Sequence, residues 1–180
     1  MEDPRRLTKA QYEKMEKALE ESIQEAGPVE FHRFSNDLGE IWAAMKPDGT
    51  DGGYAVGFAL CNPMDKSMPR RYRRWKGRHL SLSRLMTARR PVNIVMKPPF
   101  EDDENIRKRL REVITEHLFS EMQSSSDPFP PGMFGVREYR GRDERGAFRT
   151  WVRKFTEKLY NDIRVAKYRA EDAAKAEQPA

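Results

Sequence analysis

The sequence predicts an α+β protein in which a small antiparallel or mixed sheet of three to five strands is packed by about four helices. Three observations support this fold class. Four stretches repeat apolar residues at the spacing of one helix face. Short β-like runs lie between these stretches, and the order is helix, three strands, basic helix, strand, helix, possible strand, helix. We expect one domain over 1–169, followed by a flexible tail over 170–180.

The N-terminal third predicts a helix and then strands. Apolar residues recur every three or four positions over 7–26, and a Gly-Pro pair stops the pattern. A short strand is expected over 29–34. Two β-like runs, 41–45 and 54–61, flank a connector rich in Gly and Asp and therefore predict a hairpin. The second run is almost continuously apolar, which is typical of a central strand covered on both faces.

A basic helix is expected next, with Pro69 as its first residue and its end near Thr87. On a helical wheel six arginines share an arc of about 140°, and the apolar face occupies a separate arc of about 80°. The apolar arc holds these residues: Tyr72, Trp75, His79, Leu82 and Met86. Gly77 destabilises a helix by roughly 1 kcal/mol, so the helix could instead begin there and leave 70–76 as a basic loop. In both versions the arginines face solvent.

The second half of the chain predicts one strand and two further helices. A strand is expected over 92–96 and a helix over 104–122, capped by an aspartate. Residues 133–139 are a possible strand. The strongest periodicity predicts a helix over 147–169, and we expect Trp75 and Trp151 to be buried.

Charge is distributed unevenly along the chain. It has 34 Lys+Arg, 29 Asp+Glu and a net charge of +5. Residues 66–90 contain ten basic residues and no acidic one, so the other 155 residues carry a net charge of −5. The ten residues are Lys66, Arg70, Arg71, Arg73, Arg74, Lys76, Arg78, Arg84, Arg89 and Arg90. A surface for a polyanion depends on local charge, and this segment is therefore the candidate nucleic-acid-binding site.

Two alternatives to this interpretation stay open at the level of sequence. Guanidinium groups suit phosphates and also stack on bases, but the arginines could instead pair with the acidic body. Tyr72 and Trp75 could stack on bases, although their place on the apolar arc favours core packing. The sequence does not distinguish DNA from RNA.

Enzymatic function has less support. No phosphate-binding loop or nucleophile elbow is present, and we assign no catalytic residue. A metal-dependent nuclease would need convergent carboxylates, for which the candidates are Glu40, Asp48, Asp51 and Asp65, with His79 beside the cationic face. Turn formation and helix capping explain the aspartates without an active site, and we favour that explanation.

Other classes are unsupported by composition. No apolar run is long enough for a membrane helix, and no signal sequence is visible, so we expect a cytoplasmic protein without a membrane partner. Cys61 is the single cysteine, and the three histidines lack metal-site spacing. We therefore expect neither a metal nor a cofactor.

One segment resembles a known group of proteins. The stretch 57–65, followed by Gly77-Arg78 and 81–84, resembles a strand, Cys-x-x-x-Asp and Gly-Arg-x-x-x-x-x-Arg segment of small uncharacterised proteins from bacteriophages and other mobile elements. The resemblance covers residues 57–84. It implies a phage-like accessory protein in host cytoplasm, and proteins of that setting bind either nucleic acid or host machinery. Together with the basic segment, this predicts an accessory or regulatory protein that binds nucleic acid. The alternative is an interaction module or inhibitor of a host complex, such as a defence nucleoprotein or the transcription machinery.

Overall fold

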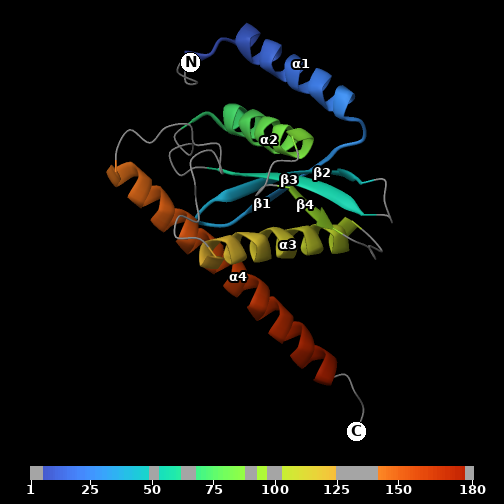
Figure 1. The fold of residues 1–180 in the computed structure, drawn as a ribbon, viewed down its shortest axis with the longest axis vertical. Helices are drawn as coiled ribbons and strands as arrows, with labels where there is room; N and C mark the ends of the chain where they lie inside the picture. Colours follow the sequence, from blue (N-terminus) through green and yellow to red (C-terminus); the bar gives the residue numbers. More distant parts are fainter. Residues whose placement is uncertain are drawn as a thin grey trace.

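The computed structural model describes residues 6–48, 53–61, 68–87, 93–96, 103–124 and 142–176. Within these residues, four helices flank one antiparallel sheet with the strand order β1-β2-β3-β4 (Figure 1). The strands are β1 Glu30–Ser35, β2 Glu40–Pro47, β3 Tyr54–Leu60 and β4 Asn93–Met96. The helices are α1 Lys9–Ala26, α2 Arg70–Thr87, α3 Asp103–Ser124 and α4 Arg142–Ala176. The predicted α+β class and the predicted hairpin, now β2 and β3, are confirmed.

The helices form layers on the two faces of the sheet. Helix α2 lies on one face with α1 stacked beyond it, and α3 lies on the other face with α4 crossing beside it (Figure 1). Two buried clusters correspond to these faces, one with α1 and α2 and the larger one with α3 and α4. Six of the seven residues of β3 are buried, which confirms the prediction of a central, doubly covered strand.

Side-chain size alternates along β3 with the period of two that a strand imposes. Val56, Phe58 and Leu60 point toward α3 and α4 and fill the larger cluster. The opposite face carries Ala55, and at Gly57 an added Cβ would overlap the backbone of α2. Small residues on this face therefore let α2 lie directly on the sheet.

Helix α1 has well-defined ends. The hydroxyl of Thr8 accepts a hydrogen bond from the backbone N–H of Gln11, and the Gln11 side chain accepts one from the Thr8 backbone, which is a complete capping box. At the other end, Gly27 has φ +84°, a conformation that favours glycine. The Gly-Pro stop expected from the sequence is confirmed.

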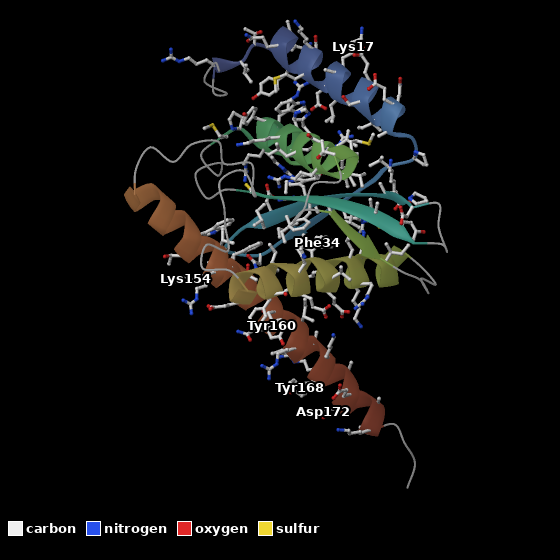
Figure 2. All side chains as sticks on the ribbon, viewed as in Figure 1. Lys17, Phe34, Lys154, Tyr160, Tyr168 and Asp172 are labelled. Atoms are coloured by element: carbon white, nitrogen blue, oxygen red, sulfur yellow. The ribbon has the colours of Figure 1, made fainter. Side chains whose placement is uncertain are left out.

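The C-terminal prediction requires a correction. Helix α4 runs from Arg142 to Ala176, so the predicted helix range of 147–169 is too short at both ends, and residues 170–176 are helical. These residues are mostly Ala, Glu and Lys, which have high intrinsic helix propensity even without packing partners. Figure 2 shows Tyr168 and Asp172 on the end of α4 that extends beyond α3. The possible strand over 133–139 and residues 177–180 lie outside the described residues.

Both tryptophans expected in the core are half-buried instead. The indole N–H of Trp75 donates a hydrogen bond to the Met15 carbonyl at 3.0 Å, and that of Trp151 donates one to the Leu38 carbonyl at 2.8 Å. The indole N–H of each tryptophan therefore links its own helix to another segment of the chain. Because this polar group needs a hydrogen-bond partner, each ring lies at the boundary of the core and is not fully buried.

Candidate nucleic-acid interface

The basic segment forms one continuous helix from Arg70 to Thr87, so the alternative of a loop over 70–76 is wrong. Its glycine has a packing reason: a Cβ at Gly77 would overlap the indole ring of Trp42 in β2. The contact compensates for the low helix propensity of glycine. Helix α2 thus presents its basic N-terminal half from a rigid element.

A cleft of about 690 Å³ lies between α1, the N-terminal half of α2 and the first two strands. Its described lining residues are Glu16, Glu20, Arg33, Glu40, Trp42, Arg70, Arg71, Arg73, Arg74 and Arg78. Six arginines and three glutamates give this lining a formal excess of three positive charges. The cleft is therefore a concave, cationic site.

The floor of the cleft contains a buried carboxylate. Glu40 is 6% exposed, and the Nε of Arg33 donates a hydrogen bond of 2.7 Å to its Oε2. Arg73 forms a longer ion pair with the other oxygen, with 3.9 Å between Nη1 and Oε1. Glu40 thereby neutralises part of the charge of two arginines and holds them in place. It was a nuclease candidate in the sequence, and the structure uses it in this ion-pair network.

Two further arginines contact α1 or β1. Nη1 of Arg78 is 3.9 Å from Oε2 of Glu16, and its guanidinium lies 4.8 Å from the ring centroid of Phe31. The guanidinium of Arg71 lies 5.0 Å from the ring centroid of Tyr12. These contacts orient the arginine side chains toward α1.

Arg70 and Arg74 differ from these neighbours. Both are exposed at the edge of the cleft, and neither forms an ion pair within the part of the chain that the structure describes. Arg71 is also exposed and has no carboxylate partner among the described residues. We define Arg70, Arg71 and Arg74 as the exposed arginine set.

Arg84 does not belong to a solvent-facing surface, and the expectation that it does is wrong. It is 8% exposed, and its Nη1 donates a hydrogen bond of 2.7 Å to the carbonyl of Phe58. The described pairing between β3 and β4 ends at Gly57, one residue before Phe58. Arg84 therefore donates to a strand carbonyl just beyond the end of that pairing. Burial lowers the pKa of Arg84 to about 10, because the charged form loses hydration.

The apolar arc of α2 is only partly as expected. Tyr72 and Leu82 are buried, which supports core packing for Tyr72 over base stacking, whereas Met86 is 48% exposed. Trp75 stacks on His79 with 5.0 Å between ring centroids and 8° between ring planes. Partial burial lowers the pKa of His79, because the charged imidazolium is less well hydrated there.

A second, smaller hollow of about 400 Å³ adjoins the cleft, with Arg33, Glu40 and Arg73 lining both. Its remaining described lining residues are Ser35, Asn36, Gly39 and Cys61. Cys61 is half-buried, and its backbone N–H donates a hydrogen bond of 2.8 Å to the Glu40 carbonyl.

Several predicted site residues lie outside the described residues, and they are Lys66, Arg89, Arg90, Asp51 and Asp65. Lys76 is described and lies 6.0 Å from the ring centroid of Tyr72.

The sequence did not indicate that Arg33 and Trp42 line the cleft. The two residues are directly opposite each other in the β1·β2 register, so both side chains lie on the α2 face of the sheet. This proximity follows from the strand register and not from any local sequence pattern.

Comparisons with known proteins add no family. No family model matches the chain, and no curated protein or solved structure is significantly similar to it. Among the described residues, no group of three or more His, Cys, Asp or Glu is placed to hold a metal ion. None of the described helices has a stretch apolar enough to cross a membrane.

Proposed function

We propose that this protein is a phage-like accessory or regulatory protein that binds nucleic acid through the exposed arginine set of α2. The observation that carries the proposal is the position of Arg70 and Arg74. They are exposed at the edge of a cleft with excess positive charge and have no ion-pair partner within the described residues. A guanidinium without a carboxylate partner can donate to phosphate oxygens without first breaking an ion pair.

The rigid placement of these arginines supports the same conclusion. They lie within little more than one turn of α2, a helix that is seated on the sheet through Gly57 and Gly77. Cations carried by a helix lose less backbone entropy when they bind phosphate than cations on a mobile segment. Binding should therefore be electrostatic and strongly dependent on salt.

The test is the affinity for fluorescein-labelled DNA and RNA oligonucleotides, measured by anisotropy over a series of salt concentrations. Reversal of all three exposed arginines to Glu should lower the affinity at low salt about tenfold or more and reduce the slope of log K against log salt by about three. The matched control reverses Arg164, Arg169 and Lys175, which are exposed on the far part of α4 and change the net charge equally.

The control separates a site from a general charge effect. If both triple variants lose the same affinity, only net charge matters and the interface is wrongly placed. If the wild-type chain binds no oligonucleotide at low salt, the proposed function is wrong.

A second function, docking onto a host protein complex, is favoured by the far part of α4. There Val165 and Tyr168 are 47% and 57% exposed on a helix segment that extends beyond α3 (Figure 2). The two residues are three positions apart and therefore neighbours on one helix face, and an exposed apolar patch, unlike a single exposed residue, is typical of interaction surfaces. Co-purification of a specific host protein by the wild-type chain, and its loss in the variant Val165→Ser/Tyr168→Ser, would support this function.

A further inference from the structure

The two hollows beside α2 adjoin one another, and we refer to the pair as the track. The same three side chains, Arg33, Glu40 and Arg73, line both of them. The exposed arginine set lies at the first hollow, Cys61 lines the second, and the Glu40 network stands where the two hollows meet. Each hollow has the size of an ordinary ligand pocket, for which the range is roughly 300–1,000 Å³.

The size and concave shape of the two hollows suit single-stranded nucleic acid better than a duplex. A duplex presents two backbones on a wide, stiff cylinder, so its phosphates meet cations on an open surface. Cations inside a hollow of this size are reached more readily by one flexible strand, whose phosphates and bases can enter separately. Proteins that bind single strands commonly combine such a positive groove with aromatic side chains.

The track has aromatic and planar surfaces as well as charge. Trp42 lines the first hollow, and the guanidinium of Arg33 lies 5.8 Å from the centre of its indole ring. The indole itself lies against Gly77 with its Nε1 buried, so the guanidinium plane of Arg33 is the surface offered to a base, and such a plane can stack on any base without sequence preference.

Arg73 has hydrogen-bonding capacity that the described structure leaves unused. Its only described ion pair, with Glu40, is 3.9 Å long, and its Nε has no hydrogen-bond partner among the described residues. A partly buried guanidinium with an unused donor is a favourable site for a phosphate oxygen after a small side-chain rearrangement. Arg73 stands at the junction of the two hollows, where a strand passing between them would contact it.

We propose that the ligand is single-stranded nucleic acid that runs along this track, from the exposed arginine set to the hollow beside Cys61. The inference rests on the proposed function and names its substrate class. The exposed arginines contact the first phosphates, Arg73 contacts the backbone at the junction, and the guanidinium of Arg33 provides a stacking surface.

The first measurement compares affinities. Single-stranded and duplex oligonucleotides of the same length and sequence, as DNA and as RNA, are titrated into the full chain at one salt concentration. We expect the single strands to bind about tenfold or more tightly, since only they reach the charges within the track.

The second measurement follows the thiol of Cys61, which is the only cysteine in the chain. The rate of its modification by an uncharged maleimide is measured alone, with saturating single strand and with saturating duplex. A strand in the second hollow should slow modification severalfold, and a duplex bound to the outer arginines should not.

A charge placed in the second hollow tests the path of the strand. Ser35 is exposed and lines that hollow, so Ser35→Glu should weaken single-strand binding. Its unfolding temperature is measured as well, and binding is compared well below it, because residue 35 is opposite Glu40 in the β1·β2 register and a second carboxylate there lowers stability. The matched control is Ser83→Glu, because Ser83 is exposed on α2 and lines neither hollow.

The outcomes distinguish this inference from the proposed function. Equal or tighter duplex binding overturns the track, and so does a single-strand preference without protection of Cys61, while nucleic-acid binding itself survives both results. Equal effects of the two serine variants also overturn the track. Absence of binding to every oligonucleotide refutes the proposed function, and the track with it.

Discussion

Gly77 of α2 lies against the indole ring of Trp42 in β2, with no room between them for a methyl group. The contact brings the helix that carries the exposed arginine set onto the strand that carries Glu40 and Trp42. The cleft therefore depends on a glycine in the middle of a helix, where propensity alone disfavours it.

Gly77→Ala should destabilise the protein. Alanine improves helix propensity by about 1 kcal/mol, but overpacking against a rigid ring typically costs about 1–3 kcal/mol. We expect the clash to dominate, because Gly57 seats the same helix on β3 and restricts its retreat. Urea denaturation of the variant measures the change.

The double variant Gly77→Ala/Trp42→Ala is the control for this prediction. With the ring removed, Gly77→Ala should become neutral or stabilising relative to Trp42→Ala alone. An equal loss in both backgrounds would show that the indole contact is not the cause.

Glu40→Gln should lower the free energy of unfolding by about 1.5–3 kcal/mol, the usual value of hydrogen bonds to charged groups. The substitution keeps the shape of the side chain but leaves Arg33 and Arg73 without their shared carboxylate. Thermal and urea unfolding check this.

Glu20→Gln is the matched variant, because Glu20 also lines the cleft but is exposed. It should change stability by less than about 0.5 kcal/mol. Both variants remove one negative charge from the cleft, and both should strengthen oligonucleotide binding at low salt. Equal stability losses would contradict the role of Glu40 in the buried network.

The stability of the fold should decrease as the pH falls through the titration range of His79. Burial lowers its pKa below the ordinary value near 6.5, so just below pH 6.5 the unfolded chain binds more protons there than the folded chain. This contribution to folding is therefore complete above pH 6.5 and is lost as the pH falls toward the folded-state pKa.

NMR titration of the His79 ring protons gives the pKa directly, and urea unfolding between pH 5 and 8 gives the linked change. His79→Gln should remove this part of the pH dependence. A His79 midpoint at or above 6.5 would contradict the effect of its partial burial against Trp75.

Removal of residues 170–180 should leave the unfolding temperature nearly unchanged. Helix α4 is exposed at every position from 164 to 176, so this end adds helical signal without core packing. Circular dichroism should show less helix with the same midpoint.

Two alanine substitutions in the same helix provide the contrast. Leu159→Ala, at a position 1% exposed, should cost about 2–5 kcal/mol, whereas Val165→Ala should cost less than about 0.5 kcal/mol. A similar cost at both positions would mean that the end of α4 is packed in solution.

Local patterns explain why much of the fold could be predicted. The spacing of apolar residues placed α1, α2 and α3 within a few residues of their observed ends, and the continuous apolar run identified β3 as a covered strand. The end of α4 was misjudged because periodicity reports packing, and this segment is helical without packing.

The candidate site was less predictable, because the order of charged residues along a sequence does not reveal which of them form ion pairs or become buried in the fold. The sequence alone determined the α+β class, the basic helix and its separation from an acidic body. Only the tertiary structure decided that Arg84 is buried on the Phe58 carbonyl, that Arg73 and Arg78 contact glutamates, and that Arg70 and Arg74 stay exposed. The physical reason is that helix periodicity is a local property, whereas burial and ion pairing depend on β-strand register and on the seating of α2, which join residues far apart in the chain.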